Sequence, residues 1–394
     1  MTHPWPVAIT GLGCICAAGT DLARCMESLY GGRRAPEAST RFTSSHPTRF
    51  PVFEVPGFAE PPELLRTSAL GLHAAREALA DAGLDLETLR GLRVGVCVGT
   101  TVGSAMNNEP FCRDYRAGLD PDLEPIERIM RSNPAAAIAR EFELTGPCQT
   151  VVNACASGTD AVGLAASWIR GGICDLAIAG GADELGRITY NGFISLMITD
   201  DSPCKPFDKN RKGLNLGEGA GMLVLESEEL RSRRGVRARS YLLGYGSACD
   251  AHHLTAPKPD GEGLRYAIAE ALSCCGTPAE AVSFVNAHGT GTPDNDRVES
   301  RVLADLLPGV PFLSTKGYTG HTLGAAGAIE AVFTVACLER GMIPGSAGFS
   351  TADPDLGGTP VQACTGISGT VALSESLAFG GNNSVILLGK RGAA

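Results

Sequence analysis

The stretch that decides the fold reads Gln149-Thr150-Val151-Val152-Asn153-Ala154-Cys155-Ala156-Ser157-Gly158. Its first half is uncharged and β-branched, which is typical of a buried strand, and the residues after it adopt helical apolar spacing up to Ile169. Cys155 is therefore predicted at a strand-to-helix junction, where unpaired N–H groups and the positive end of the helix dipole lower the pKa of a thiol. The plainer interpretation is that Cys155 is one of 14 cysteines, buried as a small apolar side chain. The rest of the chain has to decide between the two.

Composition restricts the class of protein. The chain has 394 residues, of which 44% are hydrophobic and 19% charged, so it is an ordinary globular protein that is long enough for two domains or two fused halves. A net charge of −10 argues against binding to nucleic acid. The apolar run from Val7 to Ala18 has interior glycines and no basic segment before it, so we expect no signal peptide, no membrane span and a cytoplasmic protein.

The cysteines predict a reduced protein. None of the 14 forms a Cys-x-x-Cys pair. Reduced and mostly buried thiols fit this spacing better than a zinc site or a disulfide framework. We therefore expect no structural metal site.

An internal repeat predicts two related halves. A helical pattern over residues 66–83 precedes a strand over 92–98 that stops at Gly99, and the same order returns in residues 263–276 and 282–287, which stop at Gly289. The stretches 149–171 and 312–341 also correspond, and both end on Arg-Gly. The alternation predicts α/β layers with ligands at the carboxyl ends of the strands, and a boundary that divides the chain into residues 1–234 and 235–394.

Two local features complete this prediction. Residues 7–10 are expected to form a strand that ends in a glycine turn at Gly11-Leu12-Gly13. The first half also carries about 29 extra residues, near 106–143, which we expect to cap the site or to make a subunit contact.

Two histidines follow predicted strands. His288 lies in Val285-Asn286-Ala287-His288-Gly289-Thr290-Gly291-Thr292, and His321 lies in Ser314-Thr315-Lys316-Gly317-Tyr318-Thr319-Gly320-His321. Glycine beside each histidine lets a ligand approach the backbone, and the threonines can donate hydrogen bonds. Either histidine alone is more often structural, but the repeat brings both near the reactive end of the first half.

At these residues the chain resembles the elongating β-ketoacyl-acyl-carrier-protein synthases of the thiolase superfamily. Seven motifs in the family's order carry the resemblance: 10–13, 153–158, 206–211, 217–221, 287–290, 316–327 and 379–383. The resemblance implies a five-layered αβαβα fold with two pseudo-twofold related halves, and a dimer. It also favours a nucleophilic Cys155 over a merely buried one.

The resemblance assigns the chemistry. These enzymes hold an acyl group as a thioester while a malonyl thioester loses CO2 and attacks it. Cys155 would be the nucleophile, and His288 and His321 would bind the malonyl thioester oxygen and stabilise the enolate. Lys316 would organise the site electrostatically, in an ion pair with nearby Glu299 or Asp296.

The resemblance also assigns binding roles. Backbone N–H groups of Cys155 and Phe379 would form the oxyanion hole, where Gly380 permits close approach. Thr290 and Thr292, together with Phe379 and Gly380, would hold the phosphopantetheine arm of the substrate's carrier, and no other cofactor is implied.

Departures from the family bear on the substrate. Val102, Phe193 and Leu377 match acyl-pocket positions, although core packing explains the first two equally well. Leu377-Ala378 replaces the usual Phe-Gly, and the ending Gly381-Asn382-Asn383 is most similar to the branch that serves aryl-polyene and related polyene pathways. The resemblance further implies a monovalent-cation site at Asn286, Glu330, Ser374 and Asn383, where we expect ordinary hydrogen bonding instead.

The implied partners are an acyl carrier protein and a second ketosynthase-like subunit, either identical or a chain-length-factor homologue. Carrier proteins are acidic, so docking requires a local basic patch, for which Arg66, Arg128 and Arg131 are the candidates.

Three other functions were weighed. A chain-length-factor type subunit has the same fold but should lack Cys155. A thiolase would need a second cysteine, which Cys364-Thr365-Gly366 could supply, but the histidine motif of that family is missing. A purely structural role leaves the set of Cys155, the two histidines and Lys316 unexplained.

Overall fold

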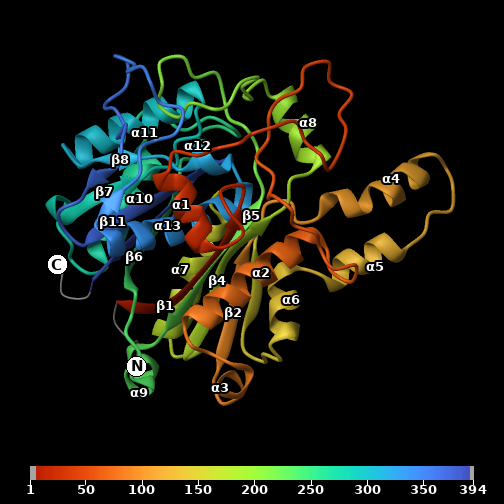
Figure 1. Cartoon of the computed structure of the whole chain (residues 1–394), viewed down its shortest axis with the longest axis horizontal. Coiled ribbons are helices and arrows are strands. Elements are labelled where there is room, and N and C mark those ends of the chain that lie inside the picture. The colour runs from red at the N-terminus through yellow and green to blue at the C-terminus, as the bar shows by residue number, and fades with distance from the viewer. Residues whose placement is uncertain (1–5, 391–394) are drawn as a thin grey trace.

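Ten strands form one continuous sheet in the order β3-β2-β4-β5-β1-β6-β12-β11-β7-β8 (Figure 1). The computed structural model describes residues 6–390. The strands of this sheet are β1 (Val7–Cys16), β2 (Val94–Gly99), β3 (Cys148–Val151), β4 (Leu176–Asp183), β5 (Gly219–Glu226), β6 (Ser240–Cys249), β7 (Val282–Asn286), β8 (Phe312–Leu313), β11 (Val371–Ala378) and β12 (Asn382–Gly389). A small second sheet pairs β9 (Met342–Ile343) with β10 (Thr365–Gly366).

The strand order is symmetric about the middle of the sheet. From the centre outward, β1, β5, β4, β2 and β3 on one side correspond to β6, β12, β11, β7 and β8 on the other. The two sides join only where Val7–Ile9 of β1 pairs with Ser240–Leu242 of β6, within the described chain. This order is what two related halves require. The division after Arg234, where α9 (Glu228–Arg234) ends at the left-handed Gly235, stays a prediction.

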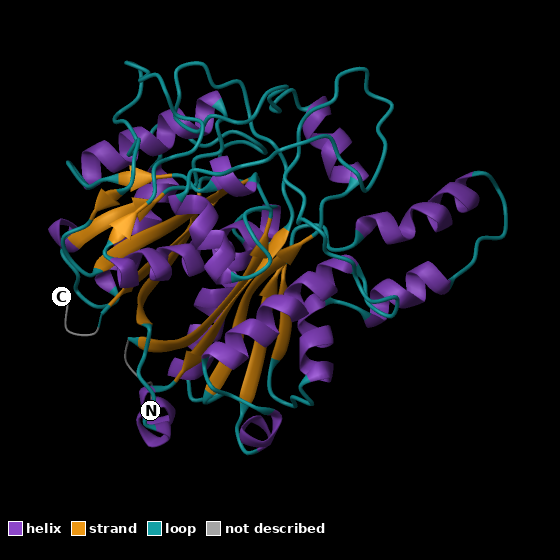
Figure 2. Cartoon of the chain, viewed as in Figure 1, coloured by secondary structure: helices purple, strands orange, loops and turns teal. Residues whose placement is uncertain are grey.

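Helices cover both sheet halves and fill the space between them (Figure 2). α7 (Ser157–Arg170) and α13 (Ala326–Arg340) pack on each other in the middle layer, α7 against β2 and β4 and α13 against β5, β11 and β12. α2 (Arg66–Asp81) and α6 (Pro134–Glu141) cover the outer face of the first half. α10 (Glu262–Ser273) covers the outer face of the second, beside α11 (Pro293–Leu306). The expected five-layered αβαβα arrangement is confirmed.

The remaining helices are short and lie at the edges of these layers. They are α1 (Leu22–Tyr30), α3 (Leu86–Arg90), α4 (Glu109–Arg116), α5 (Glu124–Arg131), α8 (Arg187–Ser195) and α12 (Lys316–Thr319), with 3₁₀ turns at Ala105–Asn108 (η1), Ala279–Ala281 (η2) and Leu323–Ala325 (η3). No helix within residues 6–390 is both long and apolar enough to cross a membrane.

The predicted glycine turn after residue 10 is wrong. β1 continues through Gly11 and Gly13 to Cys16. A Cβ on Gly13 would lie 2.0 Å from the carbonyl oxygen of Ala74 on α2, and one on Gly11 would lie 2.0 Å from that of Ala78. These glycines therefore let α2 approach the strand and do not turn the chain.

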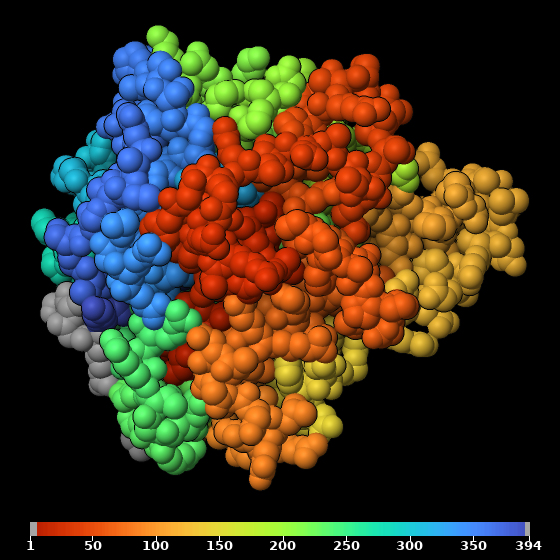
Figure 3. All heavy atoms as spheres, viewed as in Figure 1, coloured from red at the N-terminus to blue at the C-terminus, as the bar shows by residue number. Residues whose placement is uncertain are grey.

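The extra residues of the first half form a protruding hairpin of α4 and α5 (Figures 1 and 3). Large apolar side chains are exposed on it, namely Tyr115, Leu119, Leu123 and Met130, and Met130 is 77% exposed. Such a surface is typical of a protein contact.

Candidate active site

Cys155 lies between β3 and α7, at the predicted junction. Ala154 has a φ of 45°, a left-handed conformation that turns the chain sharply before the helix. The hydroxyl of Ser157 fixes this turn, because it donates to the carbonyl of Ala154 (2.6 Å) and accepts from the N–H of Asn153 (2.8 Å). The thiol is thereby held at the N-terminus of α7 and is only 4% exposed.

The expected lowering of the Cys155 pKa is not found. Burial raises the pKa of this thiol to about 12, although Lys316 and the backbone N–H groups of Phe379 and Cys155 act in the opposite direction. Desolvation of a buried thiolate outweighs the favourable end of the helix. The resting nucleophile is therefore a neutral thiol that has to lose its proton as it reacts.

His321 is the group beside this thiol. Its Nε2 lies 3.0 Å from the sulfur of Cys155, and its backbone N–H donates to the carbonyl of Asn215 at 2.8 Å. Burial, and next Lys316, lowers the pKa of His321 well below its ordinary value, so the ring is neutral. A neutral imidazole at this distance can accept the thiol proton.

His288 lies next to His321, with ring centroids 5.2 Å apart at an angle of 85°. Burial, followed by Lys316 and His321, lowers its pKa well below the ordinary value. Lys316 Nζ lies 3.1 Å from His288 Nδ1, 2.6 Å from the His288 carbonyl and 2.5 Å from Glu330 Oε1. The three protons of the ammonium group thus find three acceptors.

This contact fixes the tautomer of His288. Because Nδ1 accepts from Lys316, the ring proton of neutral His288 is on Nε2, which is then a donor. The ion-pair partner of Lys316 is Glu330, and the expectation of Glu299 or Asp296 was wrong.

Glu299 instead holds the backbone turn. Its carboxylate accepts from the N–H groups of His288 (2.5 Å) and Gly289 (2.8 Å). Burial raises its pKa to about 7, and burial together with Glu299 raises that of the neighbouring Glu375 well above its ordinary value. We infer that Glu375 stays protonated beside the Glu299 carboxylate, because two buried charges of one sign repel.

A cavity of about 340 Å³ leads to these groups. Its lining includes Cys155, His288, His321, Thr290, Thr292, Phe193, Leu377 and Phe379. The sequence predicted all eight as site residues. Thr290 and Thr292 lie on one wall, with their hydroxyl oxygens 2.9 Å apart.

Phe379 forms another wall of the cavity, and two glycines follow it in the chain. Its ring stacks on Phe193, with centroids 5.6 Å apart and planes at 15°, and its backbone N–H acts to lower the pKa of Cys155. Gly380 and Gly381 have φ of 87° and 79°, which glycine adopts readily.

Three predicted site residues lie outside the lining. Lys316 is one of them, and its Nζ reaches the site through His288 Nδ1. Gly380 is not part of the cavity wall, and Val102 packs beside it in an apolar cluster with Phe193, Ile194 and Leu323.

Several lining residues were missed by the sequence interpretation. They are Leu196, Met197, Ile198, Lys212, Leu214, Asp250, Thr255, Ala256, Pro257, Pro293, Asp294, Asn295, Ala378 and Asn383. Most lie in loops without apolar periodicity. Asn383 and Ala378 belonged to a quoted motif and could have been assigned from it.

Three other sequence candidates can be placed. Cys364 is exposed and lines a different surface pocket with Tyr30, so it is not the second cysteine of a thiolase site. Arg66 is only 4% exposed and binds Glu218 and Glu60, so its proposed role in docking was wrong. Arg128 donates to the carbonyls of Pro62 and Leu64. Arg131, whose side chain is 77% exposed, is therefore the remaining candidate for docking among the three arginines.

Three buried oxygens behind the site have no hydrogen-bond partner: Asn286 Oδ1, Glu330 Oε2 and Ser374 Oγ. They come together because Ser374 pairs with Asn286 between β11 and β7, and Asn286 Nδ2 donates to the Glu330 carbonyl. A carboxylate, an amide and a hydroxyl oxygen fit a hard cation. The expected ordinary hydrogen bonding is found for the amide nitrogens, since Asn286 Nδ2 donates to the Glu330 carbonyl and Asn383 Nδ2 to that of Gly381, whereas these three oxygens have no such partner.

Comparisons with known proteins agree with this geometry. The profile described as "Beta-ketoacyl synthase, N-terminal domain" matches residues 58–230, and "Beta-ketoacyl synthase, C-terminal domain" matches 239–350. A 3-oxoacyl-[acyl-carrier-protein] synthase 2 from Synechocystis is 35% identical over 98% of both chains.

Two solved structures are also similar. One is titled "The ishigamide ketosynthase/chain length factor" (TM-score 0.91, 34% identity, 98% of this chain and 99% of that chain). The other is a type II PKS acyl carrier protein in complex with its ketosynthase bound to the hexaketide (TM-score 0.89, 27% identity, 98% and 100%).

Proposed function

The chain belongs to the β-ketoacyl synthase family, and from this premise we propose that Cys155, His288, His321 and Lys316 carry out its reaction. The protein is a thiolase-fold 3-oxoacyl-acyl-carrier-protein synthase, an acyltransferase that condenses a Cys-bound acyl group with malonyl carrier protein as CO2 is lost. The observation that carries the residue assignment is the 3.0 Å contact between the Cys155 sulfur and His321 Nε2, with His288 against the same ring.

The first half-reaction loads the acyl group. Cys155 Sγ attacks the carbonyl carbon of an acyl thioester while its proton passes to His321 Nε2, because the thiol is neutral at rest. Backbone N–H groups of Cys155 and Phe379, which both act to lower the pKa of this thiol, are proposed to stabilise the oxyanion. The carrier's pantetheine thiol leaves with a proton, and the acyl group stays on Cys155.

The second half-reaction forms the new C–C bond. His288 Nε2–H is proposed to donate to the thioester oxygen of bound malonyl carrier protein. His321, which no longer faces a thiol proton once Cys155 is acylated, is proposed as the second donor in its Nε2–H tautomer. Loss of CO2 leaves the electron pair on an enolate, whose carbon attacks the Cys155 thioester. The sulfur then leaves as thiolate and regains a proton, and the product is a 3-oxoacyl carrier protein.

The partners follow from the surface. We propose that the acyl carrier protein docks at the cavity mouth, where Lys212 lines the cavity with its side chain 68% exposed, and where Thr290 and Thr292 receive the phosphopantetheine arm. Lys212 Nζ lies 3.8 Å from Asp201 Oδ1 in an exposed pair, and we propose that its ammonium group turns to the acidic partner on docking.

A second subunit is proposed to cover the edge strand β3 and the α4–α5 hairpin. Val152 beside this edge is 68% exposed, and β3 has a strand neighbour only on its β2 side in the described chain. Similarity to a structure titled as a ketosynthase/chain length factor favours a heterodimer with a homologue. The proposed polyene branch rests on the resemblance of Gly381-Asn382-Asn383. We also propose that the enzyme acts in the cytoplasm, as its reduced cysteines indicate.

One assay tests this function. Purified protein, alone and with a co-expressed homologous subunit, is given malonyl carrier protein and a panel of saturated and polyunsaturated acyl carrier proteins. We expect 3-oxoacyl carrier protein and one CO2 per turnover, with a preference for polyunsaturated chains. Loading of Cys155 without CO2 release would contradict the condensing role, and a preference for saturated chains would remove the polyene assignment alone.

A further inference from the structure

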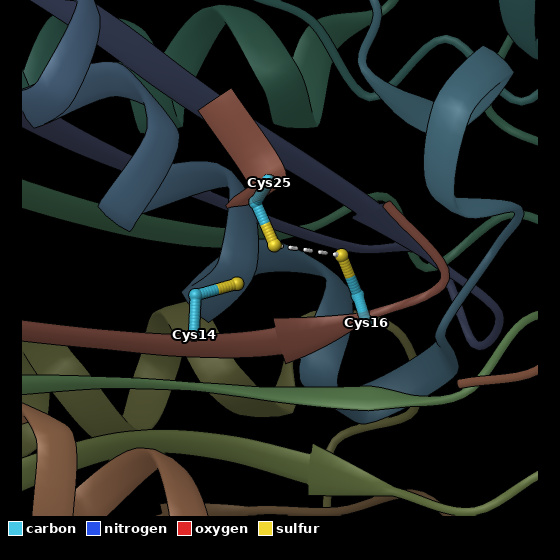
Figure 4. A group of neighbouring side chains, drawn as sticks. All are labelled: Cys14, Cys16 and Cys25. Atoms are coloured by element: carbon cyan, nitrogen blue, oxygen red, sulfur yellow. Dashed lines mark hydrogen bonds between the residues drawn. The ribbon is translucent and has the colours of Figure 1, made fainter. Parts of the chain in front are cut away.

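Three cysteines outside the active site converge in the core. Cys14 and Cys16 lie on β1, and Cys25 lies on α1 (Figure 4). Their three sulfur atoms all lie within 4.8 Å of one another, and those of Cys16 and Cys25 are 3.6 Å apart. All three side chains are completely buried, and none lines the Cys155 cavity.

The local fold explains the convergence. Cys14 and Cys16 are two residues apart on a strand, so their side chains share one face of β1, while Ile15 packs with α2 on the other. The chain then reverses at Gly19, which pairs with Cys16, and α1 returns over the same face with Cys25. No Cys-x-x-Cys spacing marks this group in the sequence.

The separations suit an ion bound by all three sulfurs. At a metal–sulfur distance of about 2.3 Å, three ligands around one ion lie about 4 Å apart. The Cys16–Cys25 separation of 3.6 Å is near that value, and the other two separations are no more than 4.8 Å. Thiolates select soft, thiophilic ions.

The charge of the surroundings decides which ion fits. Apolar side chains such as Leu12, Leu22 and Phe333 belong to the same core cluster. Glu77 is an ionisable group beside this core cluster. Its carboxylate accepts from the N–H of Cys14 (2.8 Å) and of Leu22 (2.9 Å). A net negative charge is costly in such a place, because the described residues of this cluster are apolar and Glu77 adds an acidic group beside them.

Three thiolates leave two negative charges around a monovalent ion and one around a divalent ion. Around a trivalent ion they leave none. We propose that Cys14, Cys16 and Cys25 form a binding site for a trivalent metalloid, for which arsenite is the probe.

Binding needs no oxidant or reductant. Three As–O bonds of arsenous acid break and three As–S bonds form, while the three thiol protons leave with the three hydroxides as water. A surface pocket lies beside α1, and its lining includes Leu22 and Met26 of that helix. The bound ion ties α1 to β1 and stabilises the folded chain by mass action.

The experiment uses the full-length reduced protein. We expect one tightly bound arsenic per chain, three As–S bonds by X-ray absorption, and a higher Tm with arsenite. Cys14→Ala, Cys16→Ala and Cys25→Ala should each weaken binding about 100-fold, since even outer-shell changes cost 10- to 100-fold at metal sites. Condensing activity without arsenite should be unchanged.

Matched controls separate this site from other thiols. Cys337→Ala removes a buried thiol of the same core cluster, and Cys275→Ala breaks the sequence-adjacent pair with Cys274, so neither should change the affinity or the As–S count. Two As–S bonds in wild type would overturn the proposal, even if the alanine variants fail to fold. So would tight binding of Zn²⁺ or Cu(I) at these cysteines without binding of arsenite.

Discussion

The two halves of the sheet end in equivalent loops that do different work. After β3 the first half places Cys155, whereas after β8 the second half places Lys316 and then His321. After β7 comes His288, but the loop after β2 only supports the site, since Thr101 donates to the carbonyl of Ala154 (3.0 Å). The strand order is repeated and the site residues are not. In the proposed mechanism the first half supplies the nucleophile, and the second supplies both histidines and Lys316.

Residues from the two halves can act together because the halves are in direct contact beside the site. Asp183 at the end of β4 accepts from Thr100 and Thr101 in the first half and from the N–H of Gly324 in the second (2.7 Å). Burial raises the pKa of Asp183 to about 6, although these donors oppose the shift. A Cβ on Gly327 would lie 2.0 Å from the hydroxyl of Thr159, so α7 and α13 have no space for a side chain there.

The largest effect should follow from removing the contribution of the first half. Cys155→Ala removes the atom that carries the acyl group, so acyl loading and condensation should both be abolished. Intact-protein mass spectrometry should show an acyl adduct on wild type and none on the variant. An adduct of normal yield on the alanine variant would show that another of the 14 cysteines is the nucleophile.

Changes in the second half should separate the two half-reactions. His288→Ala should still load the acyl group, because His288 does not contact the Cys155 sulfur in the structure, but CO2 release should fall about 10²-fold or more. His321→Ala should slow loading as well, because its Nε2 is the group at the thiol. Normal CO2 release by either variant would remove that histidine from the mechanism.

The pH dependence of alkylation tests the protonation state of the Cys155 thiol. Because burial raises the Cys155 pKa to about 12, the thiolate fraction should rise about tenfold per pH unit between pH 6 and 9. The rate of iodoacetamide alkylation at Cys155 should follow this rise, with Cys155→Ala as the background. A plateau below pH 8 would instead indicate a thiolate paired with an imidazolium of His321.

The sequence predicted those features of the two halves that depend on local residue patterns. Cys155, His288 and Lys316 follow apolar strands and stand beside small residues, so their placement could be predicted from spacing and family resemblance. Contacts that depend on tertiary packing could not, such as the Lys316–Glu330 pair and the close approach of α2 to Gly13. Loop residues 255–257 line the cavity without any sequence signal, and the pKa of Cys155 was predicted in the wrong direction because the extent of its burial was unknown.

A smaller effect is expected at the cavity mouth. Lys212→Glu should raise the KM for malonyl carrier protein about fivefold and weaken its salt dependence, because one exposed charge contributes up to about 1 kcal/mol. Turnover of small malonyl-pantetheine thioesters should be unchanged. Equal loss with both substrates would mean that Lys212 acts on the arm or the reaction and not on the carrier protein.

The smallest effect concerns the α4–α5 hairpin, the largest difference between the halves. Arg131 on α5 is exposed and pairs only with Glu127 in the described chain, so Arg131→Glu should raise the KM for carrier protein about threefold if the hairpin helps docking. Arg233→Glu on α9, another exposed arginine, changes the net charge equally and serves as the control. An unchanged KM in Arg131→Glu, together with weaker subunit association by analytical ultracentrifugation, would assign the hairpin and its exposed Tyr115 and Met130 to the subunit contact alone.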